Sequence, residues 1–432
     1  MRPLHTPEPG PAQAAAPSGA AASAVDAAQS ASFFVADPPR PWLHGDRPWP
    51  WLLAAALLLA LPQVFTGSFA LGLLAQMGVA TLACLSLNVL LGQGGMLSFG
   101  HAIYTGLGAY AAIHLLAHAP GLPVSLLPVA GGLAALAVAA ALGWVCARHS
   151  GGVFAMMTLA LGEMAAAVAL MFPAVFGGEA GVTANRVTGQ FLGVSFGPLA
   201  QVYYLIAAYT LGSAWLLHAF AQTPPGRLLN AVRDSDTRAQ FIGCNPHRVR
   251  WLAFMVAGFF AGVAGALAAV LFEIVTPESL GASRSGAYLL FLVLGGMRHF
   301  GGPVLGGALL VLATVWLSEI TPAWPLYMGL AFLLMMMFAP DGLAGLLGRW
   351  RQLRARAALA AAAALAGGVT LVELLYHLQS PEAAPLRLAG LALNPRQPLP
   401  WLLAAALLGA GLAGLIWQSQ RTSRPEKTHA QP

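Results

Sequence analysis

The chain has 432 residues, of which only 8% are charged and 58% are hydrophobic, and its mean hydropathy is +0.71. Soluble domains carry about 25% charged residues, so this composition excludes soluble enzymes, disordered scaffolds and nucleic-acid-binding proteins. The net charge of +6 comes from arginines between apolar runs, where it orients helices in a bilayer. Cys84, Cys146 and Cys244 are too scattered for a disulfide framework or a metal site.

Residues 1–48 are rich in Ala, Pro, Ser and Gly without periodicity, which predicts a disordered N-terminal tail. The first long apolar run begins near Trp49 and is long enough to span a membrane. We therefore expect a retained helix there and not a cleaved signal peptide.

Solid apolar runs of spanning length follow one another along the chain. They cover about residues 50–68, 70–91, 98–117, 123–146, 153–172, 200–221, 251–274, 302–320 and 324–339, with a shorter run at 286–298. Lipid offers no partners to backbone polar groups, and the runs lack the alternation of barrel strands, so spanning helices are expected. The predicted fold class is all-α, a polytopic transmembrane helical bundle of about ten core helices.

Arginine sets the predicted orientation. With the loop 223–250 on the cytoplasmic side, most arginines fall inside and only Arg186, Arg284, Arg387 and Arg396 fall outside. This distribution of arginines requires that the run 286–298 crosses the membrane. It also requires two further helices, near 357–378 and 400–417, at the C-terminal end. The weaker of these two contains Glu373 and His377 and would also fit the membrane interface.

The predicted domains follow from this arrangement. They are the tail 1–48, a transmembrane domain 49–347 with the cytoplasmic loop 223–250, a C-terminal extension 348–418 and a tail 419–432.

Glycines crowd two segments, each just before an apolar run. They are Gly92, Gly94, Gly95, Gly100, Gly106 and Gly108 in the first, and Gly295, Gly296, Gly301, Gly302, Gly306 and Gly307 in the second. Paired Gly-interrupted segments in two halves of a transporter mark discontinuous helices near the substrate path. The same residues would equally serve close helix packing.

The scarcity of lysine limits how the chain could use ATP. Lys427 is the only lysine, so the chain has no P-loop and cannot hydrolyse ATP by that route. Transport would use either a buried acid or ATP bound by another subunit. Glu163, near the middle of its apolar run, is the candidate acid, although it would also serve to tie helices together by hydrogen bonds.

The loop 223–250 is the long charged segment between apolar runs. Pro224, Pro225 and Gly226 are expected to break the preceding helix, and a short helix fits Leu228–Phe241. Gly243, Asn245 and Pro246 would end that helix. Such a helix suits insertion into the groove of a partner, and an ordinary solvated loop is the alternative.

Two catalytic interpretations deserve a test. Ser98 and His101 could face each other as the nucleophile and base of an intramembrane hydrolase, or simply cap and brace a helix start. His114 and His118 have the spacing of zinc ligands but lack a third ligand. We expect neither catalysis nor a metal.

Several motifs follow one another across about residues 70–347. They are Leu87–His101 with Gly106, Gly108, Ala109 and Tyr110; Phe154–Ala160 with Glu163 and Gly177–Gly181; Gly226, Arg227, Ala231–Asp234, Ala239 and Gly243; and Leu294–Met297, Gly301–Gly306 and Ala339–Leu343. In these motifs the chain resembles the permeases of branched-chain amino-acid ABC transporters, and their M-type subunits in particular. The chain departs from the family at Arg238 and Phe241, where small residues are usual, which implies an adapted ATPase partner.

The resemblance implies an importer in a bacterial inner membrane. Its partners would be two ATP-binding subunits, a second homologous permease and a periplasmic solute-binding protein, with ATP and magnesium on the partner subunits and no cofactor on this chain. Gly226, Arg227, Arg233, Asp234, Ala239 and Gly243 would form the coupling loop. Gly94, Gly95, Ser98, His101, Glu163, Gly295 and Gly296 are the candidates for the translocation path. An ion-coupled carrier using Glu163 is the rival interpretation.

Overall fold

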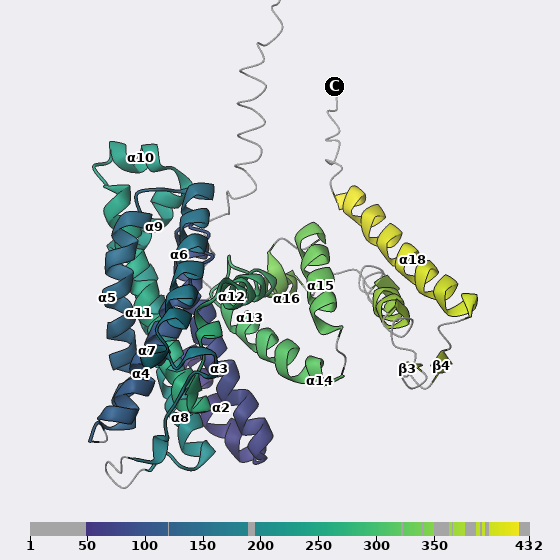
Figure 1. The fold of residues 1–432 in the computed structure, drawn as a ribbon. Coiled ribbons are helices and arrows are strands. Elements are labelled where there is room, and N and C mark those ends of the chain that lie inside the picture. Colours follow the sequence, from purple (N-terminus) through teal and green to yellow (C-terminus); the bar gives the residue numbers. More distant parts are fainter. Residues whose placement is uncertain are drawn as a thin grey trace, which may run out of the picture. The chain divides into compact units, whose positions relative to one another are not determined.

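The computed structural model describes residues 49–119, 121–188, 195–320, 323–338, 341–349, 363–364, 366–375, 386–388, 391–393 and 397–422. Helices dominate these residues, and the strands among them form two short antiparallel pairs (Figure 1). Five of the described helices are long and apolar enough to cross a membrane. The predicted all-α, polytopic bundle is therefore confirmed, while the predicted tail 1–48 lies outside the described residues.

The helices follow the predicted apolar runs. They are α2 (Trp49–Val64), α3 (Ser68–Asn88), α4 (Ala102–His118), α5 (Leu127–Cys146), α6 (Gly151–Met171), α8 (Leu199–Gln222), α11 (Pro246–Phe272), α12 (Ala282–Gly295), α13 (Gly302–Val311) and α15 (Trp324–Phe338). Helix α11 begins at Pro246, before its predicted run, because the Asn245 side chain accepts a hydrogen bond from the Arg248 amide at 3.4 Å. Asn245 thus starts this helix, as an N-cap does.

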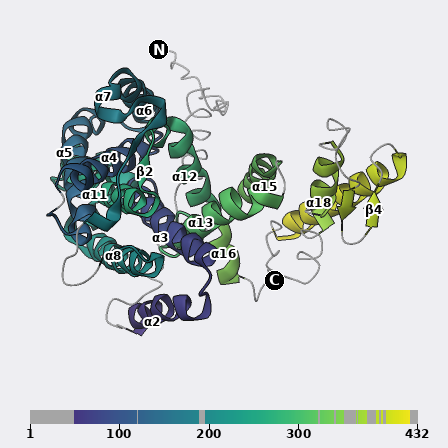
Figure 2. The ribbon, with the colours of Figure 1, turned by 60° about the horizontal axis from the view of Figure 1, so that its bottom comes forward.

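Helix α11 forms the centre of the bundle. It packs most extensively against α5 and α4 and also contacts α3 and α8, and Figure 2 shows it lying among these helices. Its sequence is rich in Ala and Gly, and most of its residues are buried. Small side chains are expected here because close approach of backbones is what holds helices together in lipid.

Glycine is required where α4, α5 and α11 meet. A Cβ on Gly131 of α5 would lie 2.6 Å from the Gly108 carbonyl oxygen, and one on Gly108 of α4 would meet the backbone of Gly262. Any larger residue at these positions would force the three helices apart. The interhelical contact is thus made by backbone atoms.

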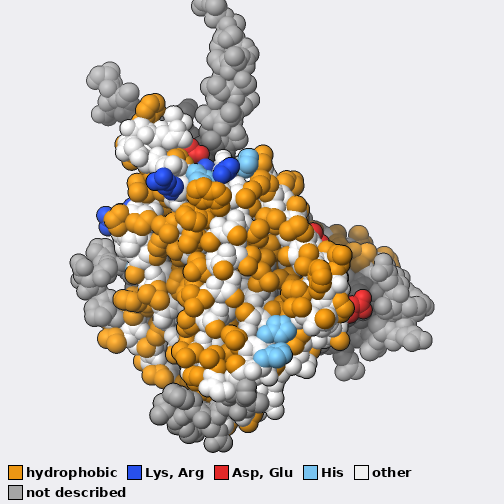
Figure 3. Space-filling model, turned by 60° about the vertical axis from the view of Figure 1, so that its left-hand side comes forward, with side chains coloured by type: hydrophobic (Ala, Val, Ile, Leu, Met, Phe, Trp, Pro, Cys, Tyr) orange, Lys and Arg blue, Asp and Glu red, His pale blue; other side chains and the backbone are white. Residues whose placement is uncertain are grey.

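The outer surface of the helices is apolar. Figure 3 shows one face on which hydrophobic side chains cover most of the area and the arginines gather toward one end. Large exposed side chains on this apolar surface include Leu133, Val145 and Met156. Lipid-facing helices with basic residues at one end have this distribution.

The C-terminal region contains α16 (Gly342–Arg349), a helical stretch at 366–375, the strands β3 (Leu386–Leu388) and β4 (Leu391–Leu393), and α18 (Pro398–Thr422). The Tyr327 hydroxyl on α15 donates to Glu373 Oε1 at 2.7 Å. Both predicted C-terminal helices are therefore present in the described residues, whereas the β3–β4 hairpin was not predicted. The domain boundaries stay predictions.

Candidate functional site

The loop between α8 and α11 contains two helices, α9 (Pro224–Asp234) and α10 (Asp236–Phe241). The predicted single helix Leu228–Phe241 is therefore wrong. Ser235 separates the two helices with extended backbone, and its hydroxyl accepts from the Arg238 amide at 3.3 Å. A serine N-cap starts a new helix in this way.

The prolines of this loop lie at the junction of two helices. Helix α8 ends at Gln222, just before Pro224, as predicted. Pro224 and Pro225 then occupy the first turn of α9, where the N–H that proline lacks is not needed. Thr223 caps α9 by accepting from the Gly226 amide at 3.5 Å. A Cβ on Gly226 would collide with the Phe220 carbonyl, so glycine permits the sharp turn out of α8.

Helix α9 lies directly on the first Gly-rich segment. Its Leu229 side chain is fully buried, and a Cβ on Gly94 would approach Leu229 Cδ1 at 3.3 Å. Contacts join α9 to α8, α11 and the π-helix η1 (Val89–Gln93) that continues α3. The predicted coupling loop is thus packed against a predicted part of the translocation path.

Arg233 makes the polar contact between these two segments. Its Nη1 donates to the Gly92 carbonyl oxygen at 2.7 Å, and its Nε and Nη2 donate to Asp234 Oδ1 at 3.2 and 3.1 Å. A Cβ on Gly95, which has a φ of +64°, would lie 2.7 Å from Arg233 Cγ. The guanidinium meets carbonyl groups at a helix end, where positive charge is favoured.

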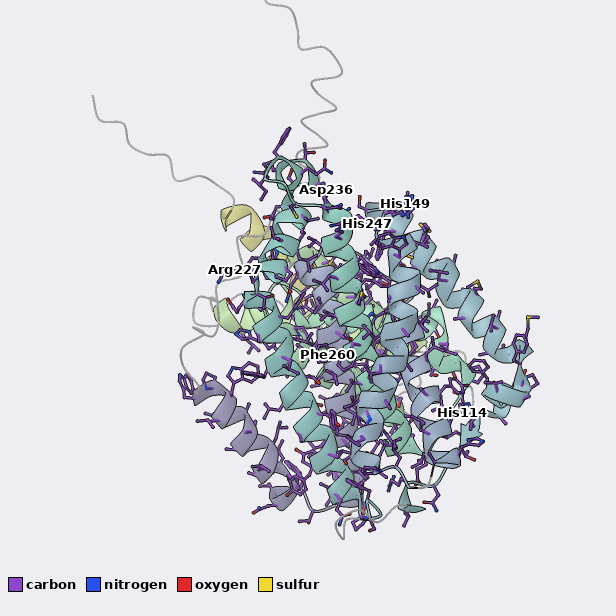
Figure 4. The ribbon with its side chains drawn as sticks, turned by 90° about the vertical axis from the view of Figure 1, so that its left-hand side faces the viewer. His114, His149, Arg227, Asp236, His247 and Phe260 are labelled. Carbon is purple, nitrogen blue, oxygen red and sulfur yellow. The ribbon has the colours of Figure 1, made fainter. Side chains whose placement is uncertain are left out.

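Helix α10 is anchored to α11 and carries an exposed apolar tip. Arg250 of α11 is 8% exposed and donates from Nη2 to Asp236 at 2.6 Å. Phe241 and Ile242, by contrast, are 85% and 71% exposed. Figures 1 and 4 show α10 and Asp236 at one end of the bundle, together with His149 and His247.

The other predicted coupling residues lie in the same helix pair. Arg227 and Asp234 are exposed on α9, while Ala239 is the buried residue of α10. Gly243 follows α10 with a φ of +81°, which agrees with its predicted place just beyond a helix end.

The first Gly-rich segment interrupts the chain between η1 and α4. Its buried backbone is stabilised by side chains from distant helices: the Phe99 amide donates to Thr158 Oγ1 at 3.2 Å, and the Ala102 amide donates to Ser285 Oγ at 2.8 Å. Non-helical backbone at membrane depth requires such partners. The sequence analysis did not predict this role for either residue: Thr158 lies in the motif Phe154–Ala160 without being singled out there, and nothing distinguishes Ser285 from other small polar residues.

Ser98 and His101 are fully buried in this segment but do not pair with each other. His101 Nε2 lies 2.8 Å from the Ser86 hydroxyl, while Ser98 Oγ has no hydrogen-bond partner among the described residues. This geometry contains no Ser–His dyad of a hydrolase. At the opposite end of α4, His118 Nδ1 contacts the His114 carbonyl oxygen at 3.0 Å.

The second Gly-rich segment touches the first. A Cβ on Gly92 would lie 2.6 Å from the Met297 carbonyl oxygen, in the turn between α12 and α13. Gly295 contacts the backbone of Gly302 and Gly306, and Gly296 has a φ of +110°. Arg298 of this turn forms an ion pair with Asp341 at 2.7 Å, just before α16.

Glu163 is exposed on α6. Its Oε1 accepts from the Ala282 amide at 3.3 Å, so the carboxylate caps the first turn of α12. A negative charge at a helix N-terminus is stabilising. The geometry thus gives Glu163 a bond between helices, and its role in transport stays a prediction.

The opposite end of the bundle is braced by Arg186. Strand β1 (Val182–Thr183) pairs with β2 (Ile274–Val275), which follows α11. Arg186 Nε donates to the Phe196 carbonyl at 2.9 Å, Nη1 donates to the carbonyls of Val270 and Leu271, and the Arg186 amide donates to Glu273 Oε1 at 2.9 Å. One side chain thus ties the loop after α6 to the end of α11.

Residues 69–340 match the family described as branched-chain amino acid transport system, permease component. Over 282 residues the chain is 30% identical to the high-affinity branched-chain amino acid transport system permease protein LivM of Escherichia coli, and equally to that of Salmonella typhimurium, covering 60% of this chain and 66% of each relative. Over 112 residues it is 35% identical to the autoinducer 2 import system permease protein LsrC of Klebsiella pneumoniae, covering 26% of this chain and 30% of that protein. No solved structure matches the chain.

Proposed function

Because the chain belongs to the family of branched-chain amino acid transport system permease components, we propose that it is the membrane subunit of an importer whose ATP is hydrolysed by separate subunits. Lys427 is the only lysine, so the chain lacks the P-loop lysine that binds ATP phosphates. The chain itself performs no covalent chemistry. ATP and magnesium belong to two partner subunits.

One observation carries the proposal: helices α9 and α10 project an exposed apolar tip while contacting a helix break inside the bundle. Phe241 and Ile242 form the tip, and Arg233 binds the carbonyl of Gly92 at 2.7 Å. A partner that moves the tip would move α9, and through Arg233 would move the π-helix η1. π-helices occur frequently at functional sites, and this one ends in the glycines that leave the backbone non-helical.

The cargo is a branched-chain or related amino acid. Support comes from the LivM relatives, which are high-affinity branched-chain amino acid permeases, although the chain spans 66% of their length. A second homologous permease and a periplasmic solute-binding protein complete the importer. Its location is the inner membrane of a bacterium, with α9 and α10 on the cytoplasmic side, where the arginines gather.

The test is extraction from the native membrane in mild detergent, followed by identification of the bound proteins and by uptake assays in liposomes. The proposal expects two ATPase subunits and a second permease to remain bound. It also expects amino-acid uptake to require ATP on the side of the liposome membrane where α10 lies. Recovery of the chain alone, with uptake driven by a proton gradient, would overturn it.

A further inference from the structure

A cavity of about 600 Å³ lies at the end of the bundle opposite to α9 and α10. Its walls come from α3, α4, α11, α12 and the 3₁₀ turn η5 (Pro277–Leu280). The cavity is partly open, and its lining extends from Glu278 and Trp324 near the helix ends to Thr105 in the first turn of α4. Its volume is within the range of small-molecule sites.

Two opposite charges line this cavity without pairing with each other. Glu278 is in η5 and Arg284 is in the first turn of α12. The two charges attract each other across the cavity, but they are too far apart for an ion pair, and neither forms one with any other described residue. Arg284 contacts Tyr288 through a hydrogen bond from Nε to the hydroxyl at 3.2 Å and through its Cζ, which lies 5.5 Å from the ring centre. The remaining guanidinium N–H groups have the fork that binds carboxylates.

The position of Arg284 also calls for an anion. A cation in the first turn of a helix is opposed by the helix dipole, and α12 is 14 residues long. The negative charge of Glu278 offsets part of this repulsion, and a ligand carboxylate bound by Arg284 would offset more of it. The Ala282 amide in the same turn already donates to Glu163, so it is not open to the ligand. The ligand carboxylate would therefore bind the guanidinium group of Arg284.

One stretch of the wall, on α4 and α11, is built from small side chains, while larger apolar residues such as Phe272 and Trp324 line other parts of the cavity. Ala109 of α4 and Ala264, Gly265, Ala268 and Ala269 of α11 line it. Small residues leave room for an aliphatic group, which gains about 25 cal/mol for each Å² of apolar surface removed from water.

We propose that this cavity binds the cargo itself, an α-amino acid zwitterion with an aliphatic side chain. Its carboxylate binds Arg284, its ammonium group binds Glu278, and its side chain lies against the Ala/Gly wall of α11. The assignment rests on the proposed import function. Thr105, which also lines the cavity, is one helical turn from His101, so this wall continues along α4 into the interrupted segment.

Direct binding tests the cavity independently of transport. The full chain is purified in detergent, and L-[³H]leucine binding is measured for the wild type and for Arg284→Gln, Glu278→Gln and Ala268→Leu. Glu319→Gln is the matched control, since Glu319 is an exposed acid that does not line the cavity. We expect each charge variant to weaken binding about tenfold or more, because each removes a hydrogen-bonded charge pair.

Competition identifies the ligand groups. 4-Methylpentanoate, which lacks the ammonium group, and 3-methylbutylamine, which lacks the carboxylate, are expected to displace leucine poorly. Ala268→Leu is expected to exclude leucine while retaining alanine. Absence of leucine binding to the wild type, or unchanged binding in both charge variants, would overturn the cavity assignment. Uptake by the assembled importer is measured separately, so failure of import would count against the proposed function and not against the cavity.

Discussion

Arg233 and Gly92 are 141 residues apart in the sequence, and a hydrogen bond of 2.7 Å joins the guanidinium Nη1 of the first to the carbonyl oxygen of the second. The bond connects α9, which lies in the charged loop between α8 and α11, with the π-helix η1 that continues α3. Gly95 lies under the same side chain with a φ of +64°. We therefore expect a movement of α9 to shift the first helix break.

Arg233→Ala is expected to separate ATP hydrolysis from transport. The variant loses a hydrogen bond from a charged group, worth about 1.5–3 kcal/mol, so uptake at a given ATPase rate should fall about tenfold. The measurement is uptake and ATPase activity in the same proteoliposomes. Arg248→Ala, an exposed arginine at the start of α11, is the control. Normal uptake per ATP in Arg233→Ala would contradict the proposed lever.

Gly95→Ala is expected to destabilise the protein. The left-handed backbone at this position costs a residue with a Cβ about 1–3 kcal/mol, and the added methyl group would also press on Arg233 Cγ. Thermal unfolding in detergent should show a lower midpoint. Gly212→Ala on α8, where no atom lies within 4 Å of the added methyl group, should raise the midpoint slightly. Equal midpoints in the two variants would show that the contact between Arg233 and residue 95 does not require glycine.

Phe241→Asp is expected to release the ATPase subunits without unfolding the chain. Phe241 is 85% exposed and so contributes little packing to this chain, whereas a central apolar contact in an interface is worth about 2 kcal/mol or more. The measurement is the amount of ATPase that co-purifies, with the exposed neighbour Gln240→Ser as the control. Unchanged recovery of ATPase in Phe241→Asp would mean that the tip is not the docking point.

Glu163→Gln discriminates between the importer and the ion-coupled carrier. The glutamine keeps an oxygen that can accept from the Ala282 amide, so the bond between α6 and α12 survives. ATP-driven uptake should stay within about twofold of the wild type, since only a charge–dipole term of about 0.3–1 kcal/mol is lost. Abolished uptake under an imposed proton gradient, with no response to ATP, would instead favour the carrier.

Arg186→Met is expected to loosen the loop that follows α6. The side chain donates to carbonyls at the end of α11 and to Phe196 and Gly197, and none of these bonds survives the substitution. Losing them should speed amide hydrogen exchange in 182–188 about tenfold or more. Exchange followed by mass spectrometry is the measurement, with the exposed Val187→Ala as the control. Equal exchange in both variants would show that β1–β2 pairing alone holds the loop.

Local sequence accounts for most of the helices. The runs 70–91 and 200–221, for example, form α3 and α8. Lipid offers no hydrogen-bond partners, so the backbone N–H and C=O groups of each run must bond to each other, and a helix does this within the segment. The missed boundary at Ser235 also had a local signal: Asp234-Ser235-Asp236 is a run of N-cap residues. Residues 233–238 also carry no apolar side chain, so no apolar periodicity joins the two ends of Leu228–Phe241.

The site, by contrast, depends on residues that are far apart. The sequence by itself determined that the chain is a bundle of apolar helices, that its charged loop lies at 223–250 and that no lysine is available to bind ATP. Only the tertiary structure decided that Arg233 meets Gly92, that Thr158 and Ser285 satisfy the interrupted backbone, and that Glu278 and Arg284 line one cavity. The physical reason is that these contacts depend on where small residues let α3, α4, α11 and α12 approach one another closely. The positions of those residues do not follow a repeating pattern in the sequence, so the contacts cannot be predicted from it.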